Sequence, residues 1–288
     1  MTRLFSPSSW DIRDSRSFQS LKSLVLAALC GQEVTDEREI SRLIPLNPPD
    51  LRNNHHLILR LELYVIELLR EQSLVDQGSL QFPINIRVMR SGVSTRRHPD
   101  RESYSTELLH CDAWSGAPSD SRNHLIYLYT ELDCPYLEMY ESLDKSDPLR
   151  SFVGSYEELP DRLFDRKKIS IPCESGIMAV WPTYSPHRTV VPAAGTSRAE
   201  NSPLRISIDF RTRESSPYEE DRNSAMDTFS DSKMNSLGVY WSFPTGATSM
   251  EDKIQVELSI ARAHGPKAYA RRREYIRKYY PDAAVSGL

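Results

Sequence analysis

The chain has 288 residues, of which 39% are hydrophobic, and a formal net charge of −4. This length and composition favour one decorated globular domain with an apolar core, and the weak charge argues against a nucleic-acid-binding protein. The polar N-terminus does not resemble a secretory signal, and the best apolar run, 21–29, is too short to span a bilayer. We therefore expect a small-molecule partner and no membrane or nucleic-acid partner.

Two amphipathic helices are predicted within residues 1–80, which we interpret as a helical N-terminal support. The first covers Ser15 to Gln32, where apolar residues recur at helical spacing. The second follows the turn at 47–50 and ends near Arg70.

Residues 81–213 have the pattern of a β-rich core. Short β-prone segments occur at 82–89, 125–130, 136–140, 169–171, 177–181 and 204–211. Stretches rich in Gly, Pro, Ser and Asn separate them, and no helical pattern lies between. Many short strands in succession predict a β-sandwich or jelly roll.

Residues 214–288 are predicted to be a C-terminal extension of the same domain, which spans 1–288. A polar stretch leads to a helical pattern from Ser249 to Tyr279. Its apolar stripe of Ile254, Leu258 and Ala261 would suit either a lid over the site or a homodimer contact. The basic run 271–273 is interpreted as a solvated helix face rather than an RNA-binding patch.

Cysteine usage indicates the redox compartment. The four cysteines show no CxxC spacing, which argues against a zinc knuckle and against a disulfide framework. A reducing cytosol fits this usage best, so we expect a cytoplasmic protein.

The strongest chemical signal is the HxD in LLHCDAW. His110 and Asp112 stand two residues apart, so on an extended segment both side chains point to the same face. His187 lies just past the strand predicted from Gly176 and would supply a third donor. Two imidazoles and one carboxylate form the facial triad of non-haem iron(II) oxygenases. An isolated HxD is common by chance, so this interpretation needs a further signal.

The segment LRISIDFR supplies that signal, because three apolar residues alternate there with four polar ones. A strand with such a polar face must turn it toward solvent or into a polar cavity. The alternative is a half-exposed edge strand whose charges pair with one another.

Taken together, the HxD, the distal histidine and the Arg-x-Ser strand resemble the iron(II)/2-oxoglutarate-dependent dioxygenases over about residues 85–211. The phytanoyl-type and carbohydrate-cluster-like members of secondary metabolism are the most similar. The resemblance implies a mostly β core, a double-stranded β-helix (jelly roll) with flanking N-terminal and C-terminal α-helices. It also implies Fe(II) on His110, Asp112 and His187, with 2-oxoglutarate and O2 as cosubstrates.

The resemblance also implies that an arginine on the strand after the distal histidine anchors 2-oxoglutarate. We assign this role to Arg205, because a guanidinium holds a carboxylate through two parallel hydrogen bonds. Ser207, on the same face, would add a hydroxyl. Arg198 is also eligible by spacing, but it lies in a turn-rich stretch. Arg211 faces the same way as Arg205 and is a second candidate, near the metal-side carboxylate.

The implied reaction is oxidation of a C–H bond by hydroxylation, cyclisation, desaturation or epimerisation. The expected substrate is a small polar natural product that contains a sugar or derives from an amino acid. Two alternatives stay open: a cupin-like metalloenzyme that does not use 2-oxoglutarate, and a non-catalytic jelly-roll binding protein. Neither alternative requires a buried arginine at position 205.

Three further features concern the surroundings of this site. His124 opens a strand, and a core or edge position is favoured for it. Trp114 and Trp181 flank the metal-binding segments and would either wall the pocket or pack in the core. The segments 114–123 and 239–248 are expected to border the mouth of the site as lids.

Overall fold

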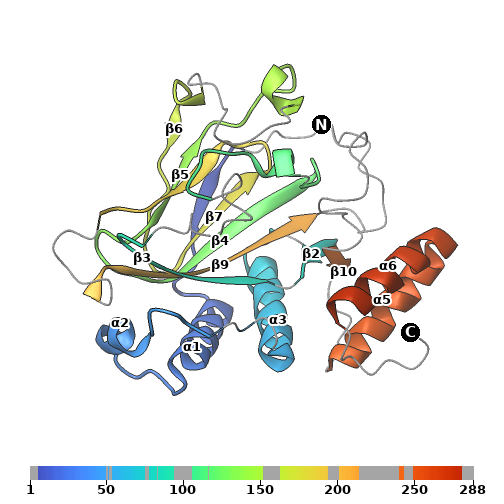
Figure 1. Cartoon of the computed structure of the whole chain (residues 1–288), viewed down its shortest axis with the longest axis horizontal. Helices are drawn as coiled ribbons and strands as arrows, with labels where there is room; N and C mark the ends of the chain where they lie inside the picture. Colours follow the sequence, from blue (N-terminus) through green and yellow to red (C-terminus); the bar gives the residue numbers. More distant parts are fainter. Residues whose placement is uncertain are drawn as a thin grey trace.

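A computed structural model describes residues 6–49, 51, 54–74, 78–82, 84–93, 106–115, 117–151, 163–193, 201–213, 240–242 and 249–280. The α-helices described are α1 (Arg16–Cys30), α2 (Ile40–Leu43), α3 (His55–Glu71), α5 (Met250–Ala263) and α6 (Pro266–Tyr279). The strands described are β1 (Ser8–Asp11), β2 (Ser79–Gln81), β3 (Asn85–Arg90), β4 (Ser121–Thr130), β5 (Tyr136–Tyr140), β6 (Lys168–Ile169), β7 (Ile177–Pro182), β8 (His187–Val190), β9 (Leu204–Arg213) and β10 (Tyr240–Ser242). Figure 1 labels most of these elements.

The strands form a large and a small antiparallel sheet. The large sheet has the order β1-β7-β4-β9-β2-β10, with β3 also paired to β9. The small sheet has the order β6-β5-β8. Within the large sheet β4 and β9 are central, and Asn123 pairs with Arg211 while Tyr127 pairs with Ser207. The two longest strands therefore hold the residues of the polar face opposite one another, with a shift of register between Tyr127 and Tyr129.

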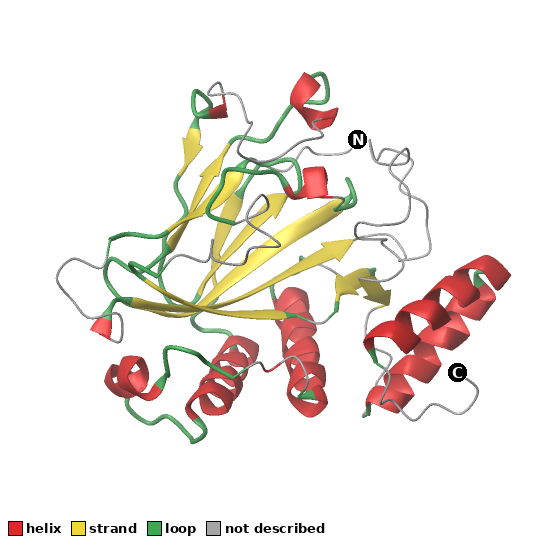
Figure 2. Ribbon diagram, viewed as in Figure 1, coloured by secondary structure: helices red, strands yellow, loops and turns green. Residues whose placement is uncertain are grey.

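One face of the large sheet packs on helices α1 and α3, which lie below it in Figures 1 and 2. Leu21 of α1, Leu61 of α3 and Ile208 of β9 are fully buried in the same apolar core. Burying each such side chain stabilises the fold by about 1.5 to 3 kcal/mol. The alternation of β9 places its polar residues on the opposite face of the sheet.

Local signals explain where the two N-terminal helices begin and end. The side chain of Ser15 accepts a hydrogen bond from the backbone N–H of Phe18 at 3.0 Å, and Gly31 ends α1 with a φ of 69°. Asn54 caps α3 through the N–H of Leu57 at 3.1 Å. Both helices match their predicted ranges to within a few residues, because the capping residue and the apolar stripe indicate the same helix start.

The mostly β core with helices at both ends is confirmed, but the sequence did not predict β1, β2, β8 or β10. Strands β1 and β2 lie within the region expected to be helical. β1 is short and exposed, and it is held by antiparallel pairing of Ser8–Asp11 with β7. Because this edge strand buries none of its side chains, its sequence has no hydrophobic alternation from which a strand could be predicted.

The predicted C-terminal helix is two helices, α5 and α6, because Gly265 has a φ of 108° and Pro266 begins the next helix. Ile254, Leu258 and Ala261 are buried within this one chain. The stripe considered for a lid or dimer contact therefore packs internally, and both of those roles remain predictions. None of the helices in the described ranges is long and apolar enough to cross a membrane.

A buried ion pair ties α5 to α3. Lys253 Nζ lies 2.5 Å from Glu62 Oε1, and both side chains are less than 5% exposed. We expect Lys253→Ala to lower the free energy of unfolding by about 3 to 5 kcal/mol, because the Glu62 carboxylate would be buried without its partner. Urea denaturation measures this change.

Two controls test the same interaction. The double variant Glu62→Leu with Lys253→Met should recover most of the loss, since neither charge of this pair stays buried. The pair of Arg38 and Asp36 is solvent-exposed, so Arg38→Ala should leave stability unchanged within error. If the double variant is as unstable as Lys253→Ala, the unpaired charge is not the cause.

Candidate metal centre

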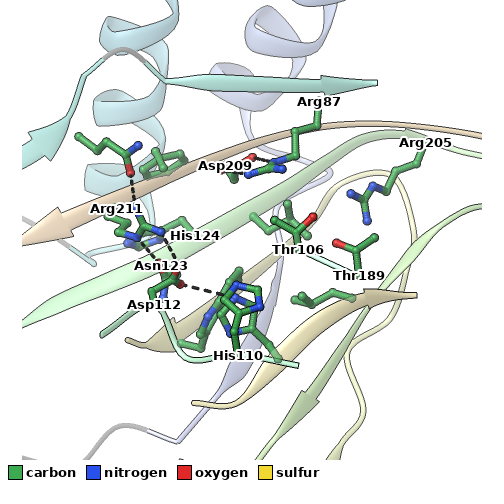
Figure 3. A pocket seen from close by; sticks show the side chains of 16 residues that line it. Arg87, Thr106, His110, Asp112, Asn123, His124, Thr189, Arg205, Asp209 and Arg211 are labelled. Atoms are coloured by element: carbon green, nitrogen blue, oxygen red, sulfur yellow. Dashed lines mark hydrogen bonds and ion pairs between the residues drawn. The ribbon is translucent and has the colours of Figure 1, made fainter. Parts of the chain in front are cut away.

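The polar face of β9 opens into a pocket between the two sheets. Its wall includes the three predicted ligands, His110, Asp112 and His187, together with Arg205 and Arg211. Figure 3 shows Arg211 and Asp112 joined on one side of this pocket, and Arg205 beside Thr189 on the other. The sheets thus bring together residues that are up to about a hundred positions apart in the sequence.

Backbone pairing places the two histidines side by side. His110 and His187 form an isolated antiparallel bridge, with N–H to carbonyl distances of 3.0 and 2.9 Å. The ring centroids are 4.4 Å apart. Each Nδ1 lies against the carbonyl oxygen two residues earlier, of Leu108 at 2.8 Å and of Ser185 at 2.9 Å. A neutral imidazole that donates through Nδ1 carries its lone pair on Nε2, the atom that can bind a metal.

Asp112 reaches the site from a turn, whereas the sequence analysis expected it on the same extended segment as His110. Only His110 has strand pairing, and Asp112 begins a 3-10 turn, Asp112–Ser115, so the HxD is not an extended segment throughout. The turn still directs the carboxylate to the histidines, with Asp112 Oδ2 3.5 Å from His187 Nε2. Arg211 Nη2 donates to the other oxygen, Oδ1. One carboxylate oxygen therefore faces the imidazoles and the other is held by a guanidinium.

The donor set fits a divalent metal ion. One ligand atom from each of His110, Asp112 and His187 lies within 4.8 Å of the others, and all three residues are buried. Two imidazole nitrogens and a carboxylate oxygen are ligands that iron(II) accepts, and these three residues would hold the ion while leaving room for further ligands. The predicted convergence of these three residues is present in the structure.

The charge states also suit a metal. The pKa of His110 is lowered to about 4. Burial is the largest cause, and the lowering effect of the neighbouring His187 is larger than the raising effect of Asp112. Burial likewise lowers the pKa of His187. Burial alone would raise the pKa of Asp112, but the Arg211 guanidinium and the two imidazoles hold that pKa far below its usual range. At neutral pH the site therefore offers two neutral imidazoles and one carboxylate.

Arg205 enters the pocket from the start of β9. It is 1% exposed, and its Nη1 donates to the carbonyl of Pro135 at 3.3 Å. Among the described residues no carboxylate pairs with it, and its Nε has no hydrogen-bond partner. Ser207 is also fully buried, with an Oγ that lacks a partner in the described part of the chain. A buried guanidinium and a buried hydroxyl without hydrogen-bond partners lower the stability of the fold unless a bound anion supplies the missing partners.

The remaining charged residues on this face of β9 are paired. Asp209 forms an ion pair with Arg87 of β3 and accepts from Asn85 Nδ2 at 3.1 Å. Arg211 donates to Asn123 Oδ1 at 2.8 Å and to Gln81 Oε1 at 3.2 Å, besides Asp112. Arg211 therefore positions the ligand carboxylate, whereas Arg205, alone of the three charged residues at 205, 209 and 211, has no acidic or amide partner among the described residues.

Other predicted neighbours have mixed outcomes. Trp181 lines the pocket, with its ring 5.2 Å from that of His187. Trp114 is instead buried in a separate apolar cluster, where its Nε1 donates to the carbonyl of Leu149 at 2.7 Å. Arg198 lies outside the described residues, as do 239 and 243–248 of the expected lid. Trp241 of that lid segment is instead fully buried in the apolar core. Asn123, at the end of the other expected lid, does line the pocket.

Several pocket residues escaped the sequence analysis. Gln81, Arg87, Thr106 and Thr189 all line the pocket. Arg87 is brought to the pocket by the pairing of β3 with β9, which a single sequence does not show. Thr189 follows His187 by two residues on β8 and could have been found from the alternation of side chains along a strand. Gln81 and Thr106 carried no such signal.

His124 is buried, in agreement with the favoured core position, and it is also among the residues that line the pocket. Its Nε2 lies 2.9 Å from Thr212 Oγ1, and its ring stacks on Phe210 at 4.8 Å. Burial lowers its pKa to about 3. The folded state thus favours the neutral ring, while the unfolded chain binds a proton near pH 6.5.

Stability should therefore fall as the pH drops from about 6.5 toward 3, by at most about 1.4 kcal/mol per pH unit for this residue. We expect His124→Asn to be less stable at neutral pH but to have a shallower pH dependence. Urea denaturation of both metal-free proteins between pH 7 and 4 measures the difference in slope. Parallel curves would mean that His124 titrates normally in the folded state.

No protein-family model matches the chain, and no curated protein matches it. Some solved structures are similar in part. The non-heme alpha ketoglutarate dependent epimerase SnoN from nogalamycin biosynthesis has a TM-score of 0.41 and 11% identity, over 81% of this chain and 89% of its own. AviO1 from Streptomyces viridochromogenes Tue57 has a TM-score of 0.41 and 14% identity, over 73% and 90%. A prolyl-4-hydroxylase from Pseudomonas putida has a TM-score of 0.34 and 13% identity, over 72% and 87%. All three TM-scores lie below 0.5, so we infer the function from the chain's own side chains.

Proposed function

We propose that this chain is a non-haem iron(II)- and 2-oxoglutarate-dependent oxygenase of the cytoplasm, an oxidoreductase. It oxidises a C–H bond of a small polar natural product by hydroxylation, cyclisation, desaturation or epimerisation. The observation that carries this proposal is the pairing of two features in one pocket. A buried His110, Asp112 and His187 triad lies on one side, and a buried arginine without an acidic partner among the described residues, Arg205, lies on the other.

The two-sheet arrangement supports a double-stranded β-helix, or jelly roll, as the underlying fold. Strands of the large and small sheets face one another, with apolar side chains such as Tyr127, Met139 and Trp181 packed between them. The triad comes from the bridge and turn before β4 and from the start of β8, and Arg205 from the start of β9. An open pocket between facing sheets is the place where such a fold holds a ligand.

Each side chain has a separate task in this proposal. His110, Asp112 and His187 hold the iron(II), which when bound supplies the activation of O2 and of the keto acid. Arg205 binds the distal carboxylate of 2-oxoglutarate through charge-assisted hydrogen bonds, and the Ser207 hydroxyl adds one more. Arg211 keeps the Asp112 carboxylate ionised and oriented, as partners of metal ligands do elsewhere. Trp181 shields the His187 ring from water.

Titration with iron(II) and then 2-oxoglutarate under anaerobic conditions tests the proposal. We expect a weak visible metal-to-ligand charge-transfer band that appears only when both are present. Tight iron binding without that band would favour a cupin-like metalloenzyme that does not use 2-oxoglutarate. Failure to bind iron at all would favour a non-catalytic binding protein. The substrate class, sugar-containing or amino-acid-derived, can then be screened by succinate production.

A further inference from the structure

Two cysteines from distant parts of the sequence touch beside the pocket. Cys134 lies in the turn between β4 and β5, and Cys173 lies in the segment before β7. Their Sγ atoms are 3.7 Å apart. Cys134 is buried and Cys173 is partly exposed, so solvent reaches one member of the pair. The other cysteines, Cys30 and Cys111, are not paired with either thiol.

This thiol pair adjoins the backbone group that holds Arg205. The carbonyl of Pro135, next to Cys134, accepts from Arg205 Nη1 at 3.3 Å and from the Cys173 thiol at 3.8 Å. Movement of either cysteine therefore acts on the same carbonyl that fixes the guanidinium. The contact between the thiols lowers the pKa of Cys134 and raises the pKa of Cys173, so the reactive thiolate is favoured on the buried member of the pair, Cys134.

We propose that Cys134 and Cys173 form a reversible disulfide that lowers the affinity of the pocket for 2-oxoglutarate. A hydroperoxide oxidises one thiol to a sulfenic acid and is itself reduced to water or an alcohol. The sulfur of the second thiol then attacks, so that the S–S bond forms and the S–O bond breaks. The hydroxyl leaves as water with the second thiol's proton. The sulfurs must approach by about 1.7 Å to reach the bonded distance of about 2.05 Å.

The effect on binding follows from the contacts of Pro135. Closing the two sulfurs displaces the turn that carries this carbonyl, so the guanidinium of Arg205 loses its hydrogen bond to Pro135 and keeps only the weaker contact of Nη2 with Met89 Sδ. A less organised anchor binds its carboxylate more weakly, on the order of fivefold for one hydrogen bond of about 1 kcal/mol. The disulfide itself depends only on the thiol pair, whereas its effect on 2-oxoglutarate rests on the proposed function.

Peptide mapping of the full chain tests the disulfide directly. The metal-free protein is treated with hydrogen peroxide, blocked with N-ethylmaleimide and digested without reductant. We expect a cross-linked peptide containing Cys134 and Cys173 and a fall from four free thiols to two, reversed by dithiothreitol. Cys134→Ser and Cys173→Ser should each abolish the cross-link, while Cys30→Ser should leave it intact. Four remaining thiols, or sulfinic acid without a cross-link, would overturn the proposal.

Binding measurements test the functional consequence. After removal of peroxide, the protein is loaded with zinc(II) as a redox-inert metal and titrated with 2-oxoglutarate by calorimetry. We expect the oxidised wild type to bind on the order of fivefold more weakly than the reduced form. Peroxide-treated Cys134→Ser should bind as the reduced wild type does. A cross-link with unchanged affinity would refute the coupling. If even the reduced protein binds no 2-oxoglutarate, the proposed function fails while the peptide map still decides the disulfide.

Discussion

His187→Ala is expected to abolish iron binding at micromolar metal and to lower substrate-coupled succinate formation by on the order of a thousandfold, about 4 kcal/mol. The substitution removes one of only two imidazoles in the triad, and it also removes the ring that packs against Trp181. Anaerobic iron titration measures the first effect, and succinate quantification under saturating iron measures the second.

His124→Asn is the matched control for this prediction. His124 is as deeply buried as His187, but it bonds to Thr212 and does not belong to the triad. Its replacement should leave iron affinity within about twofold of the wild type, apart from any loss of stability. If His187→Ala keeps full iron affinity in a folded protein, the metal centre has been assigned to the wrong residues.

Arg205→Ala is expected to raise the KM for 2-oxoglutarate on the order of a hundredfold, since two charge-assisted hydrogen bonds to a carboxylate are lost. Iron affinity should stay close to that of the wild type, because Arg205 does not contact the triad. Arg205→Lys should fall between the two proteins, since an ammonium keeps the charge but not the paired geometry. Steady-state kinetics with varied 2-oxoglutarate, together with iron titration, separate these effects.

Arg198→Ala is the comparison that decides between the two arginines considered from the sequence. It should change the KM for 2-oxoglutarate much less than Arg205→Ala does. The reverse ranking would move the anchor to Arg198 and leave Arg205 as a buried structural residue.

The candidate site was largely predictable because Arg205 and Arg211 lie on an alternating strand and the HxD spacing is compact, although Asp112 reaches the site from a turn and not from the expected extended segment. HxD spacing and the alternation of LRISIDFR identified His110, Asp112, Arg205 and Arg211 without coordinates. The sequence did not indicate that Arg211 pairs with Asp112, since that contact joins residues 99 positions apart. It also gave no sign that Cys134 meets Cys173, because neither has a neighbouring motif. Contacts set only by sheet registration stay hidden in a single sequence.

The fold was predictable where elements are long and amphipathic. Helices α1 and α3 and strand β9 carry strong periodic patterns, and strands β4 and β7 contain runs of β-prone residues, so their positions were close to those observed. The short strands β2 and β10 have no such pattern, and they form only because β9 and its neighbour offer free edges. The break at Gly265 was also missed, since α5 and α6 share one continuous helical pattern in the sequence.

Strand β9 lies between the apolar core and the pocket. Its successive side chains point alternately to the one and to the other. Ile206 and Ile208 belong to the apolar core that they share with residues of α1 and α3, while Arg205, Asp209 and Arg211 line the pocket. Inserting or deleting a single residue near the start of β9 would exchange these two sets of side chains. The guanidinium groups would then be buried against α1 and α3, and Arg205 would no longer reach the pocket. Natural variation in this strand should therefore consist of substitutions only, with length changes confined to the loops on either side.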